Sequence, residues 1–115
     1  MQSIYNKKGK TVGWLSNEDI YDVKGDFIGY IKNNAVYNRS SEYCGSLNQS
    51  VFRDRNGYVV AFMGGATKLR VLPALKPAPT KPNKKRKPHL KKPSSSSTPK
   101  SIKLGWSSIG WDSFI

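Results

Sequence analysis

The sequence predicts an all-β domain of four tandem β-hairpins around a pseudo-fourfold axis, followed by a disordered basic tail. The first observation is a sixteen-residue repeat: the pattern Ile-Tyr-Asp-x-x-Gly that begins at Ile20 has an earlier copy that begins at Ile4. The second is a small residue that recurs inside each predicted strand at the same spacing. The third is that residues 1–75 contain no segment with helical periodicity.

Each repeat predicts a hairpin because it contains a four-residue turn signal. Residues 6–9 place Asn at the first turn position and Gly at the fourth, and residues 22–25 and 54–57 fit the same template. Asn or Asp at the first position bonds the backbone two residues on, and Gly accepts a positive φ at little cost. In the third copy Ser41 replaces the glycine, which predicts a looser turn or one of another type.

A strand with two-residue alternation follows each turn. We predict that Val12 and Trp14 face one side of the sheet, that Gly13 and Leu15 face the other, and that the later copies repeat this pattern. A small residue repeated inside a strand marks the close approach of a backbone or a large ring. We therefore expect all four small residues to meet at a crowded central axis. These residues are Gly13, Gly29, Gly45 and Ala61.

Aromatic residues also recur along the repeats. Tyr5, Tyr21, Tyr37 and Phe52 are interpreted as one row, which makes Arg53 a one-residue insertion absorbed by a bulge. Exposed aromatic rows beside positive charge can stack on nucleic-acid bases. Because the residues repeat in every hairpin, core packing is the simpler interpretation and the one that we favour.

The composition divides the chain into four segments. Residues 1–66 hold the repeats, and residues 67–75 predict a strap over the domain or one more strand. Residues 76–103 contain ten Lys or Arg and no acid, within a chain of net charge +13. Chains rich in Lys, Pro and Ser stay extended and bury too little surface to fold alone. We therefore predict a disordered linker over 76–103.

Residues 104–115 are apolar again, with two Trp, two Ile, one Leu and one Phe. Apolar side chains left in water would be a liability, so we predict that this segment is a docking peptide for a protein partner. Ser108 is expected to cap a single helical turn. Docking within the same chain and docking on another molecule both stay open. The predicted docking residues are Trp106, Ile109, Trp111, Phe114 and Ile115.

Three motifs carry a family resemblance: Ile-Tyr-Asp-x-x-Gly from Ile20, the Gly-Tyr-Ile element from Gly29, and residues 52–57 with the strand after them. Through them residues 3–66 resemble the 4-fold beta flower domain family of bacterial proteins. Members are also similar in having a Lys/Pro-rich tail that ends in a Trp-Ser-x-x-x-Trp-x-x-Phe segment, which residues 106–114 match. The resemblance implies four β-hairpin petals around an axis and brings no established activity.

The residue inventory argues against an enzyme. The single histidine, His89, lies in the basic tail, so Cys44 has no fixed base beside it. Cys44 is expected to be a small buried hydrophobe, and Asp22 and Asp54 are explained as turn residues. No metal-binding motif or phosphate-binding loop is present. We predict no catalytic residue, no metal and no cofactor.

The N-terminal residues contain no apolar export signal, and the longest apolar run, 58–63, is too short to span a membrane. A cytoplasmic location is therefore expected. A single cysteine also rules out an internal disulfide.

These observations predict a non-enzymatic accessory or adaptor protein. Its tail would associate with DNA or RNA regardless of sequence, through counterion release. Alternatives are a solvated spacer, association of the basic and aromatic tail with an anionic membrane surface, and carbohydrate or wall binding. Oligomerisation also stays open. The predicted nucleic-acid contacts are Lys81, Lys84, Lys85, Arg86, Lys87, Lys91 and Lys92.

Overall fold

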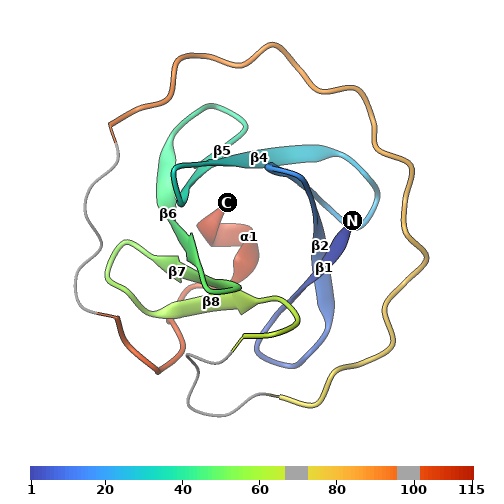
Figure 1. Cartoon of the computed structure of the whole chain (residues 1–115), viewed down its shortest axis with the longest axis vertical. Coiled ribbons are helices and arrows are strands. Elements are labelled where there is room, and N and C mark those ends of the chain that lie inside the picture. Colours follow the sequence, from blue (N-terminus) through green and yellow to red (C-terminus); the bar gives the residue numbers. More distant parts are fainter. Residues whose placement is uncertain (67–72, 96–101) are drawn as a thin grey trace.

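The computed structural model describes residues 1–66, 73–95 and 102–115, which form a closed antiparallel barrel surrounded by an outer loop of chain (Figure 1). Each strand pairs with its neighbours in the sequence, and pairing of the first strand with the last closes the ring. This confirms the predicted all-β class. The strands are β1 (Gln2–Tyr5), β2 (Thr11–Ser16), β3 (Asp19–Tyr21), β4 (Phe27–Lys32), β5 (Ala35–Asn38), β6 (Tyr43–Asn48), β7 (Val51–Asp54) and β8 (Val59–Phe62).

The barrel consists of four hairpins, β1–β2, β3–β4, β5–β6 and β7–β8, which we call petals, and the turn of each is its tip. In all four tips the last turn residue donates its N–H to the carbonyl of the first, at 2.9–3.1 Å. The expected looser third turn is wrong. Ser41 adopts a positive φ of 63°, and the Asn38 side chain accepts N–H bonds from Ser40 and Glu42 just as Asp and Asn do in the other tips.

A β-bulge follows each tip and changes which residues share a face. Ile4 is opposite Gly13 and Tyr5 is opposite Thr11, so Val12 is the extra residue in the first petal. The bulge turns Val12 toward the barrel axis, where it packs in the same cluster as Leu15. Trp14 lies in a separate aromatic cluster. The predicted common face of Val12 and Trp14 is therefore wrong, because a bulge interrupts the two-residue alternation.

The fourth petal contains no insertion. Arg53 is opposite Val59, as Tyr5 is opposite Thr11 in the first petal. Arg53 therefore occupies the position of the tyrosines, and Phe52 aligns with Ile4. The interpretation of Phe52 as a member of the tyrosine row is wrong. Arg53 is buried, and burial lowers the pKa of its guanidinium.

Two clusters of side chains form most of the core. The axial cluster is centred on four residues in register with zero exposure: Ile4, Ile20, Val36 and Phe52. The second cluster lies on the other side of the sheet and is almost entirely aromatic. The expectation that the repeated aromatics pack as core is confirmed for Tyr21 and Tyr37 in this cluster. The cluster consists of Trp14, Tyr21, Phe27, Tyr30, Tyr37 and Tyr43, with Ala35 beside them.

A short helix, α1 (Trp111–Phe114), fills the centre of the ring (Figure 1). A Cβ added to Gly13 would lie 3.6 Å from the Trp111 ring, and one added to Gly45 would lie 2.8 Å from the Phe114 ring. The nearest atom to each added Cβ is a carbonyl oxygen of the neighbouring strand, that of Tyr21 for Gly13 and that of Arg53 for Gly45. The expected crowding at the axis is therefore confirmed, and it comes from the adjacent strand as well as from α1. Gly110 stands at the helix N-cap without a side-chain cap, so the predicted capping role of Ser108 is wrong.

Among the described residues, no helix has the length and hydrophobicity that crossing a membrane requires.

Candidate functional site

Residues 73–95 run in an extended conformation around the outside of the petals, and we call this segment the belt (Figure 1). Composition predicted a disordered linker over 76–103, whereas the structure places residues 76–95 against the barrel. The prediction considered only side-chain burial, and main-chain hydrogen bonds attach the belt. Residues 96–101, and most of the strap or strand predicted over 67–75, lie outside the described residues.

The belt and the segment after it donate one main-chain hydrogen bond to each petal tip, in the order of the petals. Successive donors are nine residues apart, and successive acceptors are sixteen residues apart. Each sixteen-residue petal is thus bonded to one nine-residue stretch of the belt or of the segment after it. The bonds are Lys76 N–H to Gly9 O (3.0 Å), Lys85 to Gly25 (3.0 Å), Ser94 to Ser41 (2.9 Å) and Lys103 to Gly57 (3.1 Å).

Glycine at the tips is explained by the belt as well as by the turn. A Cβ on Gly9 would collide with the carbonyl oxygen of Ala74, and one on Gly25 would collide with that of Asn83. Both glycines also have positive φ angles, of 75° and 92°. The tip glycines therefore allow two stretches of backbone to come together.

The third petal holds the belt through additional side-chain bonds. The Ser41 hydroxyl donates to the Lys91 carbonyl at 2.8 Å and accepts from the Tyr30 hydroxyl at 2.8 Å. The Ser94 hydroxyl accepts the Tyr43 N–H at 2.9 Å. A glycine could not supply the first two bonds, so the residue that departs from the repeat gives this petal side-chain bonds to the belt that a glycine tip cannot make.

Replacing Ser41 with glycine is expected to loosen the belt without disturbing the turn. The glycine would adopt the positive φ readily, while one buried and one part-buried hydrogen bond are lost, at about 1 kcal/mol each. We expect trypsin to cleave the Lys91–Lys92 bond several-fold faster in folded Ser41→Gly than in the unaltered protein, whereas Pro93 blocks cleavage after Lys92 in both. Ser40→Gly, at the adjacent exposed position, is the control and should leave the cleavage rate unchanged. Equal rates for both variants would contradict this role of Ser41.

Lysines of the belt also contact the second petal. Lys85 and Lys87 form ion pairs of 3.0 Å with Asp26 and Asp19 of this petal. Lys84 donates to the hydroxyl of Ser16, at the end of β2 in the first petal, at 3.2 Å. The hydrogen bond from Lys85 lowers the pKa of the Asp26 carboxyl. These groups are exposed to solvent, which screens their attraction, so each pair adds little to stability. Their main effect is to fix the position of the belt.

The seven basic residues predicted to contact nucleic acid therefore fall into two groups. All seven side chains are exposed, and Lys84, Lys85 and Lys87 also bond to the barrel, as described above. For the other four no bond to the barrel is described through their side chains. No acidic residue occurs between residues 73 and 95, so no basic residue of the belt has an acidic neighbour in the belt sequence. The other four are Lys81, Arg86, Lys91 and Lys92.

The residues predicted to dock a partner contact the barrel of their own chain. Trp111 and Phe114 are buried, with 6% and 5% exposure, and Ile115 packs over Gly29. Trp106 is half-buried, with its ring centre 6.1 Å from that of Phe62. Of the five, only Ile109 is largely exposed, at 40%. Docking, which the sequence left open, occurs within the chain in this structure.

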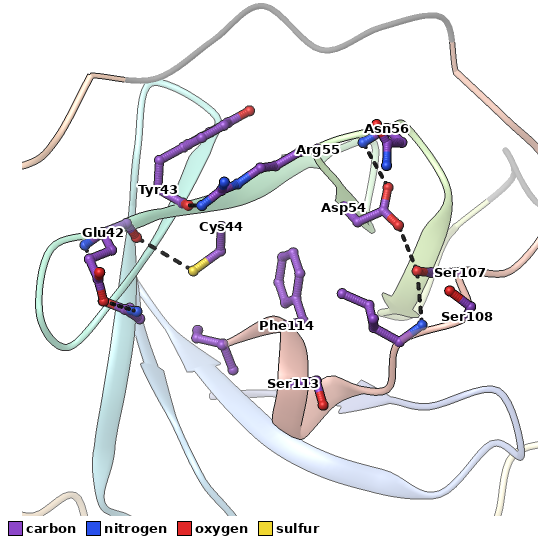
Figure 2. Close-up of a pocket in the computed structure, with 13 residues that line it drawn as sticks. Glu42, Tyr43, Cys44, Asp54, Arg55, Asn56, Ser107, Ser108, Ser113 and Phe114 are labelled. Atoms are coloured by element: carbon purple, nitrogen blue, oxygen red, sulfur yellow. Dashed lines mark hydrogen bonds between the residues drawn. The ribbon is translucent and has the colours of Figure 1, made fainter.

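A pocket of about 420 Å³ lies between the third and fourth petals and the C-terminal segment (Figure 2). Its polar groups already bond one another. Asp54 accepts N–H bonds from its own turn and a 2.6 Å bond from the Ser107 hydroxyl. The Arg55 guanidinium donates to the Tyr43 carbonyl and lies over the Tyr43 ring.

Cys44 lines the same pocket and contacts the axial cluster. It is buried, as predicted, and burial raises the pKa of its thiol. A thiol that stays protonated is a poor nucleophile, and no histidine lines the pocket. Within the described residues, no group of three or more His, Cys, Asp or Glu side chains is placed to hold a metal ion. The pocket therefore offers no catalytic arrangement of the kinds considered from the sequence.

Sequence reasoning missed the residues that position the belt. Ser41, Asp19 and Asp26 were assigned to turns or left without a role, although each bonds the belt. The available signal was the departure of Ser41 from the glycine of the repeat.

Comparison with known families gives a match to the model of the 4-fold beta flower protein over residues 2–115. The match includes the belt and the C-terminal segment as well as the petals. Neither the curated proteins nor the solved structures gave a match.

Proposed function

This chain belongs to the 4-fold beta flower family, and from the charges on its belt we propose that it is a non-enzymatic module that binds nucleic acid independently of sequence. One observation carries the proposal. All eight basic side chains of the belt are exposed and the belt contains no acid, and only two of them, Lys85 and Lys87, form ion pairs with barrel carboxylates among the described residues. The basic side chains of such a segment neutralise phosphates and release the counterions condensed on the nucleic acid, which gives affinity without base recognition.

Attachment of the belt strengthens this proposal. A disordered arm loses conformational entropy when it binds, and that loss reduces affinity. Here the main-chain bonds at Gly9, Gly25 and Ser41 already hold the belt. The cations Arg86, Lys91 and Lys92 are therefore displayed on a supported backbone.

The geometry favours nucleic acid over the two alternatives drawn from the sequence. A membrane is a flat surface, whereas the belt follows the curved outer edge of the ring (Figure 1), so a bilayer would reach only part of it. Interfacial anchoring would also need exposed aromatic side chains, and Trp111 and Phe114 are buried. Carbohydrate binding would need an exposed aromatic row, whereas Tyr21, Tyr37 and their neighbours are core. Capture of a partner by residues 104–115 would require displacing them from the barrel.

Neutralising four exposed belt cations that make no described side-chain bond to the barrel is expected to weaken binding by at least tenfold at about 0.1 M salt. Because each lost phosphate contact removes about 0.7 from the log–log salt slope for a single strand, the slope should fall by about three. The variant carries Lys81→Gln, Arg86→Gln, Lys91→Gln and Lys92→Gln. Fluorescence anisotropy of a labelled twenty-nucleotide oligothymidine across a salt series provides the measurement.

The control removes the same number of charges from the petal tips, through Lys7→Gln, Lys8→Gln, Lys10→Gln and Lys24→Gln. We expect a distinctly smaller loss of affinity. Equal losses would show that total charge, and not the belt, determines binding. If the unaltered protein binds neither DNA nor RNA at about 50 mM salt, or sediments only with phosphatidylserine vesicles, the proposed function is wrong.

A further inference from the structure

We infer that the ligand of the belt is a flexible single strand that follows the outer edge of the ring, in preference to a duplex. The inference rests on the proposed function. It follows from three features: the arc over which the cations are spread, the curvature of that arc, and the position of the aromatic rings beneath it.

The exposed cations lie along an arc and not in one patch. The belt reaches the first petal at Lys76, the second at Lys85 and the third at Ser94. Lys81 therefore lies between the first and second petals, and Lys92 lies close to the third. At about 3 Å per residue of extended chain, about 30 Å of belt separates these two lysines.

This arc is strongly curved compared with a duplex. The molecule measures 37 Å by 35 Å across its two longer dimensions, whereas duplex DNA stays straight over a persistence length of about 50 nm. A straight rod touches a convex edge at one place, so a duplex at Arg86 cannot also reach Lys81 and Lys92. A single strand bends freely and can contact the whole arc.

The aromatic rings beneath the belt make base stacking unavailable to the bound strand. Trp14, Tyr21 and Tyr30 are each at most 7% exposed, and Leu90 of the belt packs against their cluster. Lys87 lies over the Phe27 ring at 5.6 Å. The strand is therefore held through its phosphates, and we expect no base preference.

The test compares one labelled single strand and one duplex of equal length, about sixteen nucleotides or base pairs, with variants at the two ends of the arc. At about 0.1 M salt we expect the single strand to bind at least tenfold more tightly. For the single strand, Lys81→Gln and the pair Lys91→Gln and Lys92→Gln should each reduce affinity several-fold, and combining them should multiply the losses. For the duplex the combined loss should be no larger than the greater single loss. Lys32→Gln, at the exposed last residue of β4, is the control for charge.

The inference would be overturned if the duplex bound as tightly as the single strand or more tightly, and if the affinity losses of the Lys81 and Lys91/Lys92 variants multiplied for the duplex as well. The proposed function would then remain intact. Affinities that differ strongly among oligothymidine, oligoadenine and oligocytosine would overturn the phosphate-only contact. Failure of both ligands to bind would instead refute the proposed function on which the inference rests.

Discussion

Replacing Trp111 with alanine is expected to destabilise the protein by about 3–5 kcal/mol. Trp111 is 6% exposed and packs edge to face on Phe52, with ring centres 5.2 Å apart. It also contacts Phe114, with ring centres 5.8 Å apart. Its removal would leave a cavity in the middle of the barrel, because the closed ring of strands cannot collapse inward. Denaturant unfolding followed by far-UV circular dichroism measures the loss.

Ile109 provides the matched control for this experiment. It lies two residues before Trp111 in the same segment but is 40% exposed. Ile109→Ala should change the free energy of unfolding by no more than about 0.5 kcal/mol. If both variants unfold at the same denaturant concentration as the unaltered protein, α1 contributes nothing to the core and its central position has no energetic role.

Replacing Gly45 with alanine is expected to cost about 3 kcal/mol, the upper end of the usual range for overpacking. The added Cβ would collide with the carbonyl oxygen of Arg53 on the neighbouring strand and would lie 2.8 Å from the Phe114 ring. The ring could adjust, but the backbone carbonyl is held by the pairing of β6 with β7. Separating these strands would disturb the closed barrel. The loss is again measured by denaturant unfolding.

Gly64→Ala makes the same chemical change where space is available. No atom lies within 4 Å of a Cβ at Gly64, and its φ is not positive. Its effect on the unfolding free energy should be no more than about 0.5 kcal/mol. A Gly45→Ala variant as stable as Gly64→Ala would mean that the strands at the axis can move apart easily.

The repeat predicted the barrel because it specified both turns and crowding. Asn6 and Gly9 and their later copies predicted the tips, and Gly13, Gly29 and Gly45 predicted a filled axis. The repeat alone could not predict which side chains fill the axis. Trp111 and Phe114 lie far along the chain from those glycines, and an apolar segment alone does not show what it contacts.

The error in aligning the repeats arose because residues were matched by type and not by their spacing in the sequence. Phe52 was aligned with the tyrosines because both are aromatic, although strict sixteen-residue spacing from Tyr37 gives Arg53. The bulge at Val12 could not be predicted from alternation, because a bulge is an interruption of that alternation.

The belt was missed for a different reason. Its composition resembles that of disordered chains, which indicates little side-chain burial but does not reveal main-chain hydrogen bonds. Part of its nine-residue spacing is visible in the sequence, since Pro73 and Pro82 are nine residues apart, as are Lys76 and Lys85. The residue types depart from this spacing at Lys91 and Ser94, although the main-chain bond from Ser94 keeps it, and at this petal the side-chain bonds of Ser41 and Ser94 are added.

The matched spacing of belt and petals limits how this protein can evolve. A solenoid can gain a repeat by a single duplication, because each repeat contacts only its neighbours. Here a duplicated petal would add sixteen residues to the ring, leave the outer segment nine residues too short, and widen the axis around a helix of fixed size. Three separate parts of the gene would have to change together. Four petals are therefore a constrained number, and we expect related chains to vary in petal sequence much more than in petal count.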